Sequence, residues 1–181
     1  EVFGGKREVF SRAATSQRMS LTAGVIAVQG DVSEHGDAIR SAARAHGEEV
    51  TVREIRQSGI VPDCDLLLIP GGESTTISRL VEREGIDEEI RAHVEADKPL
   101  LATCAGLILV SRDANDERVT TLDLLDISVE RNAFGRQRDS FEAPLSVTGL
   151  DDPFPAVFIR APVIDDVGDG VEVLAVWEDR P

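Results

Sequence analysis

The chain has 181 residues, of which 41% are hydrophobic, and its 34 acidic and 19 basic side chains give a formal net charge of -15. A chain of this size buries a single core, and its negative field excludes nucleic acid and anionic membranes as natural partners. Its two cysteines, Cys64 and Cys104, form no disulfide framework, and no segment reaches the roughly 18 apolar residues of a membrane span. We therefore expect a soluble, cytoplasmic protein.

The two ends of the chain differ from its middle. Residues 1–18 lack clear periodicity and carry four basic against two acidic side chains, which fits either a basic arm or a disordered N-terminal extension. We expect the extension, followed by a single domain over residues 19–181. The chain stops at Pro181, four residues after an extended segment. Because exposed strand edges invite misassembly, we expect the domain to be incomplete at its C-terminus and prone to aggregate.

The first half alternates extended and helical segments. Apolar or alternating runs predict strands at residues 24–28, 50–53, 66–69 and 99–103. Apolar residues at helical spacing predict helices at residues 33–46, 77–81 and 86–94, and Gly47 caps the first of them. Such repeated units predict an α/β fold with a parallel sheet covered on both faces. The second half is richer in strands, expected at residues 126–130, 141–147, 156–160 and 171–177.

Cys104 stands where the fourth predicted strand meets an apolar helix. A nucleophile on such a turn needs small neighbours, and Ala102, Ala105 and Gly106 provide them. The helix N-terminus favours the thiolate, and its N–H groups can hold an oxyanion. A buried cysteine that packs as a small hydrophobic residue is an equally good interpretation of the spacing, and is our default for Cys64.

Two further segments carry polar chemistry. Residues 70–76 place two glycines and then Ser74, Thr75 and Thr76 after a buried strand, which fits a ligand loop or simply a turn with a helix cap. No lysine follows at the spacing of a phosphate-binding loop. Arginines at residues 129–137 and 159–162 could bind a carboxylate, although surface charge balance is the preferred interpretation in so acidic a protein. The glycine and cysteine loops both leave carboxyl ends of parallel strands, where ligands usually bind.

Taken together, the segments resemble a known family. Six of them occur in its order, at residues 28–30, 70–76, 103–107, 129–137, 140–143 and 158–162. This set resembles the glutaminase subunit of pyridoxal 5'-phosphate synthase, in the class I (triad) glutamine amidotransferase superfamily, over residues 24–177. The resemblance implies a flavodoxin-like three-layer α/β/α sandwich with a mostly parallel central sheet, here without its C-terminal elements.

The resemblance also implies a reaction and its residues. It makes Cys104 the nucleophile, and the backbone N–H groups of Gly72 and Ala105 the oxyanion hole. The implied activity is hydrolysis of L-glutamine to L-glutamate and ammonia, which passes to the synthase subunit that makes pyridoxal 5'-phosphate (vitamin B6). No metal or organic cofactor is implied for the glutaminase. Gln29 lies in a loop that rearranges in similar proteins when the synthase subunit docks. The positions implied for glutamine binding are Gly72, Glu73, Ser74, Arg131, Ile159 and Arg160.

Two departures from the family pattern bear on activity. Ala102 replaces a glycine, and the chain ends before the Ser-Phe-His-Pro-Glu-type turn that supplies the catalytic His and Glu. His35, His46 and His93 fall in predicted helices and match no triad position, so we expect ordinary packing or surface roles for them. We therefore expect impaired glutaminase turnover. A glutaminase-like subunit that only binds the synthase is the alternative, and another cysteine hydrolase on the same fold is a weaker one.

Overall fold

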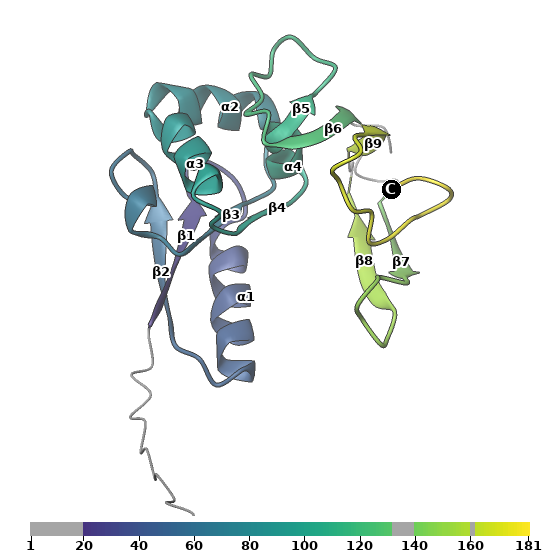
Figure 1. Cartoon of the computed structure of the whole chain (residues 1–181), viewed down its shortest axis with the longest axis horizontal. Coiled ribbons are helices and arrows are strands. Elements are labelled where there is room, and N and C mark those ends of the chain that lie inside the picture. The colour runs from purple at the N-terminus through teal and green to yellow at the C-terminus, as the bar shows by residue number, and fades with distance from the viewer. Residues whose placement is uncertain (1–19, 132–139, 160–161) are drawn as a thin grey trace, which may run out of the picture.

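A computed structural model describes residues 20–131, 140–159 and 162–181 (Figure 1). The extension predicted for residues 1–18 lies outside these ranges. The first half contains β1 (Leu21–Ile26), α1 (Val32–Ala45), β2 (Val50–Ile55), the 3-10 helix η1 (Val61–Asp63), β3 (Leu66–Ile69), α2 (Ser74–Arg83), α3 (Ile86–Glu95), β4 (Leu100–Ala102) and α4 (Ala105–Val110). The second half contains β5 (Ser111–Asp113), β6 (Leu125–Glu130), β7 (Phe141–Leu145), β8 (Phe154–Phe158) and β9 (Val163–Val167).

The central sheet has the order β2-β1-β3-β4, and all of its pairings are parallel. Val25 pairs with Leu68, and Leu68 with Leu101, so that strands β1, β3 and β4 are aligned in register. The α/β fold with a mostly parallel central sheet, predicted from the sequence, is confirmed. Because all four strands run the same way, the loops that leave their carboxyl ends gather at one edge.

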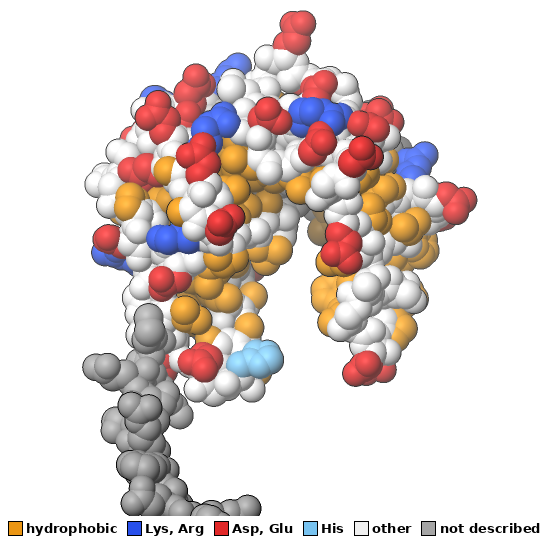
Figure 2. All heavy atoms as spheres, viewed as in Figure 1, with side chains coloured by type: hydrophobic (Ala, Val, Ile, Leu, Met, Phe, Trp, Pro, Cys, Tyr) orange, Lys and Arg blue, Asp and Glu red, His pale blue; other side chains and the backbone are white. Residues whose placement is uncertain are grey.

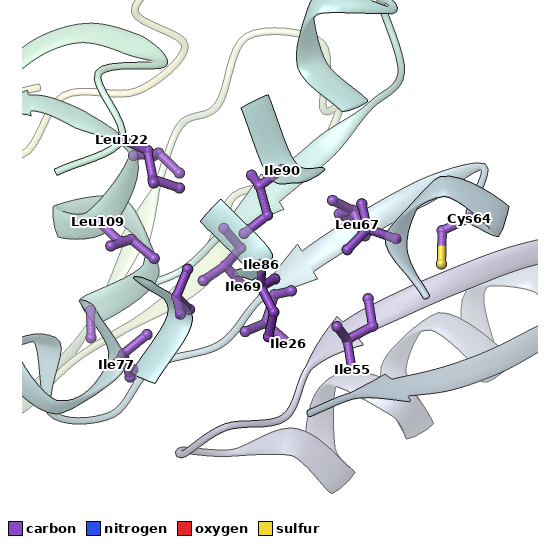
Figure 3. Packing of buried hydrophobic residues seen from close by; sticks show 14 residues of the cluster. Ile26, Ile55, Cys64, Leu67, Ile69, Ile77, Ile86, Ile90, Leu109 and Leu122 are labelled. Atoms are coloured by element: carbon purple, nitrogen blue, oxygen red, sulfur yellow. The ribbon is translucent and has the colours of Figure 1, made fainter. Parts of the chain in front are cut away.

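Side-chain alternation along the strands produces three layers. Val25 and Leu68 point to one face of the sheet, where they pack with Val32 and Ile39 of α1. Their neighbours in sequence point to the other face, against α2 and α3 (Figure 3); the fully buried side chains there include Ile26, Leu67, Ile69, Ile77, Ile86 and Ile90. Each such aliphatic side chain contributes about 1.5–3 kcal/mol when it is removed from water.

Cys64 belongs to this core, as the default interpretation of the sequence expected. Its side chain is fully buried, and its thiol donates to the carbonyl oxygen of Ile60 at 3.4 Å (Figure 3). Burial raises the pKa of the Cys64 thiol, which disfavours the reactive thiolate.

The second half forms two small sheets. The first has the strand order β5-β6-β9, in which β5 and β6 are parallel and β6 and β9 antiparallel. Arg112 on β5 forms ion pairs with Asp126 on β6 and Asp166 on β9. Strands β7 and β8 form an antiparallel hairpin that lies apart from the four-stranded sheet (Figure 1). The space-filling view shows the molecule hollowed between the hairpin and the main body (Figure 2).

One strand predicted for the second half was wrong, and two strands, β5 and β9, were not predicted. Residues 171–177 are not a strand, since their backbone pairs with no ladder in the described part of the chain apart from one isolated bridge between Trp177 and Arg180. Trp177 instead packs against Phe141 and Phe158 of the hairpin, with ring centroids 5.8 and 6.0 Å away. Strand β9 was missed, because two central aspartates lower its apparent β-propensity although it pairs with β6.

Within the described residues, no helix has the length and apolar character needed to cross a bilayer.

Candidate active site

The glycine loop and the cysteine loop lie side by side. Ile69 at the end of β3 pairs with Ala102 at the end of β4, so the segments that follow leave the sheet together. A Cβ atom built on Gly71 would lie 3.4 Å from the Cβ and 4.0 Å from the Sγ of Cys104. The structure thus brings together the two segments that the sequence placed at the same edge of the sheet.

Cys104 occupies a strained turn. Its φ of 50° and ψ of -107° are unusual for a residue with a side chain, and such backbone costs roughly 1–3 kcal/mol that the surroundings must offset. Three backbone hydrogen bonds flank it: Thr103 N–H to Ile69 at 3.0 Å, Gly106 N–H to Thr103 at 2.8 Å, and Ile108 N–H to Cys104 at 3.2 Å. The side chain is exposed at the start of α4. The turn therefore presents the Cys104 side chain at the surface.

The small size of Gly106, two residues after Cys104, is required by packing. A Cβ atom at Gly106 would lie only 2.2 Å from the carbonyl oxygen of Ile69, so no larger residue fits there. Ala102, which departs from the family pattern, is accommodated as the last residue of β4. The turn forms despite that substitution.

Gly72 adopts a φ of 154°, and a side chain there would collide with Gln29. The side-chain oxygen of Gln29 would lie 2.4 Å from a Cβ atom at Gly72, and it accepts a hydrogen bond from the backbone N–H of Glu73 at 2.9 Å. The loop after β1 therefore packs directly on the glycine loop. A substituent at Gly72 would be strained by the backbone conformation and would force the end of the Gln29 side chain to move.

Glu73 caps helix α2. Its carboxylate accepts from the backbone N–H groups of Thr75 at 3.2 Å and Thr76 at 2.7 Å, and from the Thr76 hydroxyl at 2.7 Å. The capping role considered for residues 74–76 is therefore wrong, because the cap is one residue earlier and Ser74 is buried in the first turn. Burial alone would raise the pKa of Glu73, but these hydrogen bonds outweigh it and lower the pKa to about 2.

Arg131 reaches the glycine loop from the end of β6. Its guanidinium lies 2.5 Å from the carboxylate of Asp116 and 3.3 Å from that of Glu73, and only 12% of its side chain is exposed. The hydrogen bonds that Arg118 donates from its side chain and backbone, helped by its charge and by the weaker effect of the Arg131 charge, hold the pKa of Asp116 well below its usual range. Surface charge balance, the interpretation preferred from the sequence, does not describe the pair of Arg131 and Asp116, whose side chains are only 12% and 17% exposed.

The second predicted arginine segment lies only partly within the described residues. Ile159 follows β8 in the separate hairpin and is 45% exposed, while Arg160 lies outside the described residues, as do residues 132–139. The predicted site residues that the structure brings together are Gly72, Glu73, Ser74, Cys104, Ala105 and Arg131.

The histidines divide into two groups. His93 is buried, its Nε2 lies 3.1 Å from the carbonyl oxygen of Pro99, and burial lowers its pKa. His46 ends α1, so both have the structural or surface positions expected. His35 differs, because its Nε2 lies 2.9 Å from the hydroxyl of Thr103, the residue before Cys104. The sequence could have singled out His35, because it follows the loop that leaves β1, at the same sheet edge as Cys104.

Metal-binding clusters are not found: the described residues contain no group of three or more His, Cys, Asp or Glu side chains arranged to hold an ion.

Comparisons with known proteins agree on one family. Residues 25–180 match the model of the SNO glutamine amidotransferase family. The chain is 73% identical, over 90% of its length and 83% of the relative's, to the pyridoxal 5'-phosphate synthase subunit PdxT of Haloarcula marismortui. It is 54% identical, over 86% of its length and 80% of the relative's, to PdxT of Methanosarcina acetivorans. A solved glutamine amidotransferase structure superimposes with a TM-score of 0.76 at 44% identity, covering 88% of this chain and 82% of that one.

Proposed function

We propose that this chain, which belongs to the SNO glutamine amidotransferase family, is a glutaminase subunit of pyridoxal 5'-phosphate synthase, with Cys104 as its nucleophile. Its substrate is L-glutamine, and its products are L-glutamate and ammonia. The ammonia passes to a synthase subunit, which is the protein partner. The observation that carries the proposal is the strained, exposed Cys104 turn lying against the Gly71–Gly72 loop.

The chemistry is covalent catalysis by the thiolate. The Sγ atom of Cys104 attacks the side-chain carbonyl carbon of glutamine, and the carbonyl oxygen becomes an oxyanion. The backbone N–H groups of Gly72 and Ala105 are the proposed donors to that oxyanion, and preorganised donors of this kind contribute about 3–4 kcal/mol each. The amide nitrogen takes up the proton that the thiol released and leaves as ammonia, so that a γ-glutamyl thioester remains. Water hydrolyses this thioester to glutamate and the free thiol.

The charged residues beside the glycine loop, Arg131, Asp116 and Glu73, are the proposed basis of substrate recognition. Arg131 is positioned by Asp116 and is the proposed partner of the glutamine α-carboxylate, since a guanidinium binds carboxylates with two parallel hydrogen bonds. Glu73 remains ionised at neutral pH because its pKa is about 2, which suits a partner of the α-ammonium group. Ser74, Ile159 and Arg160 complete the proposed glutamine-binding set.

Covalent labelling tests the nucleophile and the substrate together. A chloroketone analogue of glutamine alkylates a positioned thiolate, forming a carbon–sulfur bond and releasing chloride. We expect one adduct per chain, on the Cys104 peptide, with L-glutamine slowing the reaction and Cys104→Ala abolishing it. Cys64, which is fully buried, is the internal control. Labelling that L-glutamine does not slow, or that occurs equally on Cys64, contradicts the proposal.

A second measurement separates catalysis from binding alone. Ammonia release from L-glutamine is followed with and without the synthase subunit, and association of the two chains is measured in parallel. Association with ammonia release that Cys104→Ala removes supports a working glutaminase. Association without any ammonia release identifies a subunit that only binds the synthase.

A further inference from the structure

His35 joins helix α1 to the turn that carries Cys104. Its Nε2 atom lies 2.9 Å from the hydroxyl of Thr103, a residue 68 positions away in sequence, and its Nδ1 atom lies 2.8 Å from the carbonyl oxygen of Asp31. Thr103 is the residue immediately before Cys104. The ring is thus held on both sides, with one nitrogen on its own helix and the other on the nucleophile turn.

The two contacts define the direction of the hydrogen bonds. A backbone carbonyl oxygen can only accept, so the Nδ1 atom of His35 must carry the proton that it shares with Asp31. In the neutral ring Nε2 is then an acceptor, and the Thr103 hydroxyl donates to it. The hydroxyl of Thr103 therefore has one preferred orientation, which restrains the side chain next to the strained backbone of Cys104.

Asp31 connects the start of helix α1 to the glycine loop. Its backbone N–H donates to the carbonyl oxygen of Gly71 at 3.4 Å, and a Cβ atom at Gly71 would lie 3.6 Å from its Oδ2. Asp31 and His35 thus contact both loops of the proposed site: one contact is to the glycine loop and the other to the cysteine loop.

We infer that Asp31 and His35 form a strut that sets the separation between the Cys104 thiol and the Gly72 loop, and that His35 is a positioning residue for attack on the substrate carbonyl. This inference rests on the proposed glutaminase function. A nucleophile and its oxyanion donors must be placed to well within 1 Å, because larger errors cost up to about 100-fold in rate. A contact that ties both loops to one rigid helix provides that placement.

The strut is separable from the packing of α1. The helix is held to the sheet by Val32 and Ile39, which contact the buried cluster around Val25 and Leu68. His35 is only partly buried and is absent from that cluster. Removal of its ring should therefore leave the helix in place while it releases the Thr103 hydroxyl.

Two reagents separate positioning from simple thiol reactivity. The chloroketone analogue of glutamine uses both the thiol and the donors to its carbonyl oxygen, whereas iodoacetamide needs only an accessible thiolate. For His35→Ala and for Thr103→Val we expect the chloroketone rate constant to fall about threefold to tenfold, as the loss of one hydrogen bond predicts. The rate constant for iodoacetamide should change less than about twofold, since the contact between His35 and Thr103 does not set the ionisation of the Cys104 thiol.

Further variants test whether the two side chains act as one unit. The double variant should be no slower than either single variant, because both remove the same contact. His35→Gln, whose amide oxygen can accept from Thr103, should restore part of the rate. His46→Ala, at the other end of α1, is the matched control and should match the parent chain.

The outcomes are distinct. Unchanged chloroketone rates in both single variants, equal slowing with both reagents, or additive slowing in the double variant would overturn the strut. Absence of chloroketone labelling in the parent chain would overturn the proposed function, and the inference with it. Thermal melts of every variant, expected within a few degrees of the parent, show whether the fold is intact.

Discussion

The guanidinium of Arg131 lies 3.3 Å from the carboxylate of Glu73, although 58 residues separate the two in sequence. This contact brings the end of β6 to the glycine loop that follows β3. Since Glu73 also caps α2, one carboxylate both begins a helix and pairs with the proposed substrate-binding arginine. The proposed glutamine pocket is therefore built from both halves of the chain.

Arg131→Met should weaken glutamine binding far more than it slows alkylation at saturation. A hydrogen bond to a charged group is worth about 1.5–3 kcal/mol, which corresponds to roughly 10- to 150-fold in the dissociation constant. The measurement is the L-glutamine concentration that half-protects Cys104 from the chloroketone. Arg118→Met is the control: Arg118 pairs with the same Asp116, but its side chain is 72% exposed, so protection should change less than about twofold. Equal effects of the two substitutions would argue against a substrate role for Arg131.

Glu73→Gln should remove a pH-dependent part of the stability. The folded-state pKa of Glu73 is lowered to about 2 from its usual 4.5, so the carboxylate stabilises the fold fully above pH 4.5. That contribution is lost as the pH falls from about 4.5 toward 2. The stability difference between parent and variant should therefore be largest near neutral pH and shrink on acidification. Because half of the side chain is exposed, solvent screening limits its size.

The difference between parent and variant is the informative quantity in that experiment, because the other 33 acidic residues affect both chains alike. Denaturant unfolding at a series of pH values measures it. A difference that stays constant from pH 7 down to pH 2 would show that the Glu73 charge does not stabilise α2.

Core packing allows a matched comparison between two leucines of neighbouring strands. Leu67 on β3 is fully buried, and its truncation to Ala should cost about 2–5 kcal/mol of unfolding free energy. Leu101 on β4 is 57% exposed, so Leu101→Ala should change stability by less than about 0.5 kcal/mol. Chemical denaturation of the two variants checks this. Similar losses for both would mean that the β4 side chain is covered in solution.

Much of this architecture was predictable from local patterns. The continuous apolar run at residues 24–28, which buries Val25 on one face and Ile26 on the other, and the repeated strand–helix units are visible in the sequence and predicted the parallel sheet. The positions of Gly72 and Cys104 followed from the same reasoning, because both come directly after a strand. These features depend on neighbours in sequence, which is why the pattern was sufficient.

What could not be predicted depends on contacts between distant residues. The pairing of Arg131 with Asp116 and the contact of His35 with Thr103 require knowledge of which loops meet. Competition between adjacent polar residues misled the prediction of the α2 cap, since Glu73 rather than Ser74 supplies it. The false strand at residues 171–177 had the right residue types but no partner strand among the described residues, and a ladder needs a partner.

Gly106→Ala should be among the most damaging single-methyl substitutions. The new methyl would lie 2.2 Å from the carbonyl oxygen of Ile69, and backbone at the end of a central strand cannot move aside cheaply. Overpacking of this kind costs about 1–3 kcal/mol. Here the strain should also displace Cys104, two residues earlier. We expect a lower melting temperature and slower chloroketone labelling. Gly170→Ala, where nothing lies within 4 Å of the added atom, is the control and should melt like the parent. A Gly106→Ala chain that melts and reacts like that control would mean that the turn is looser than its close contact with Ile69 indicates.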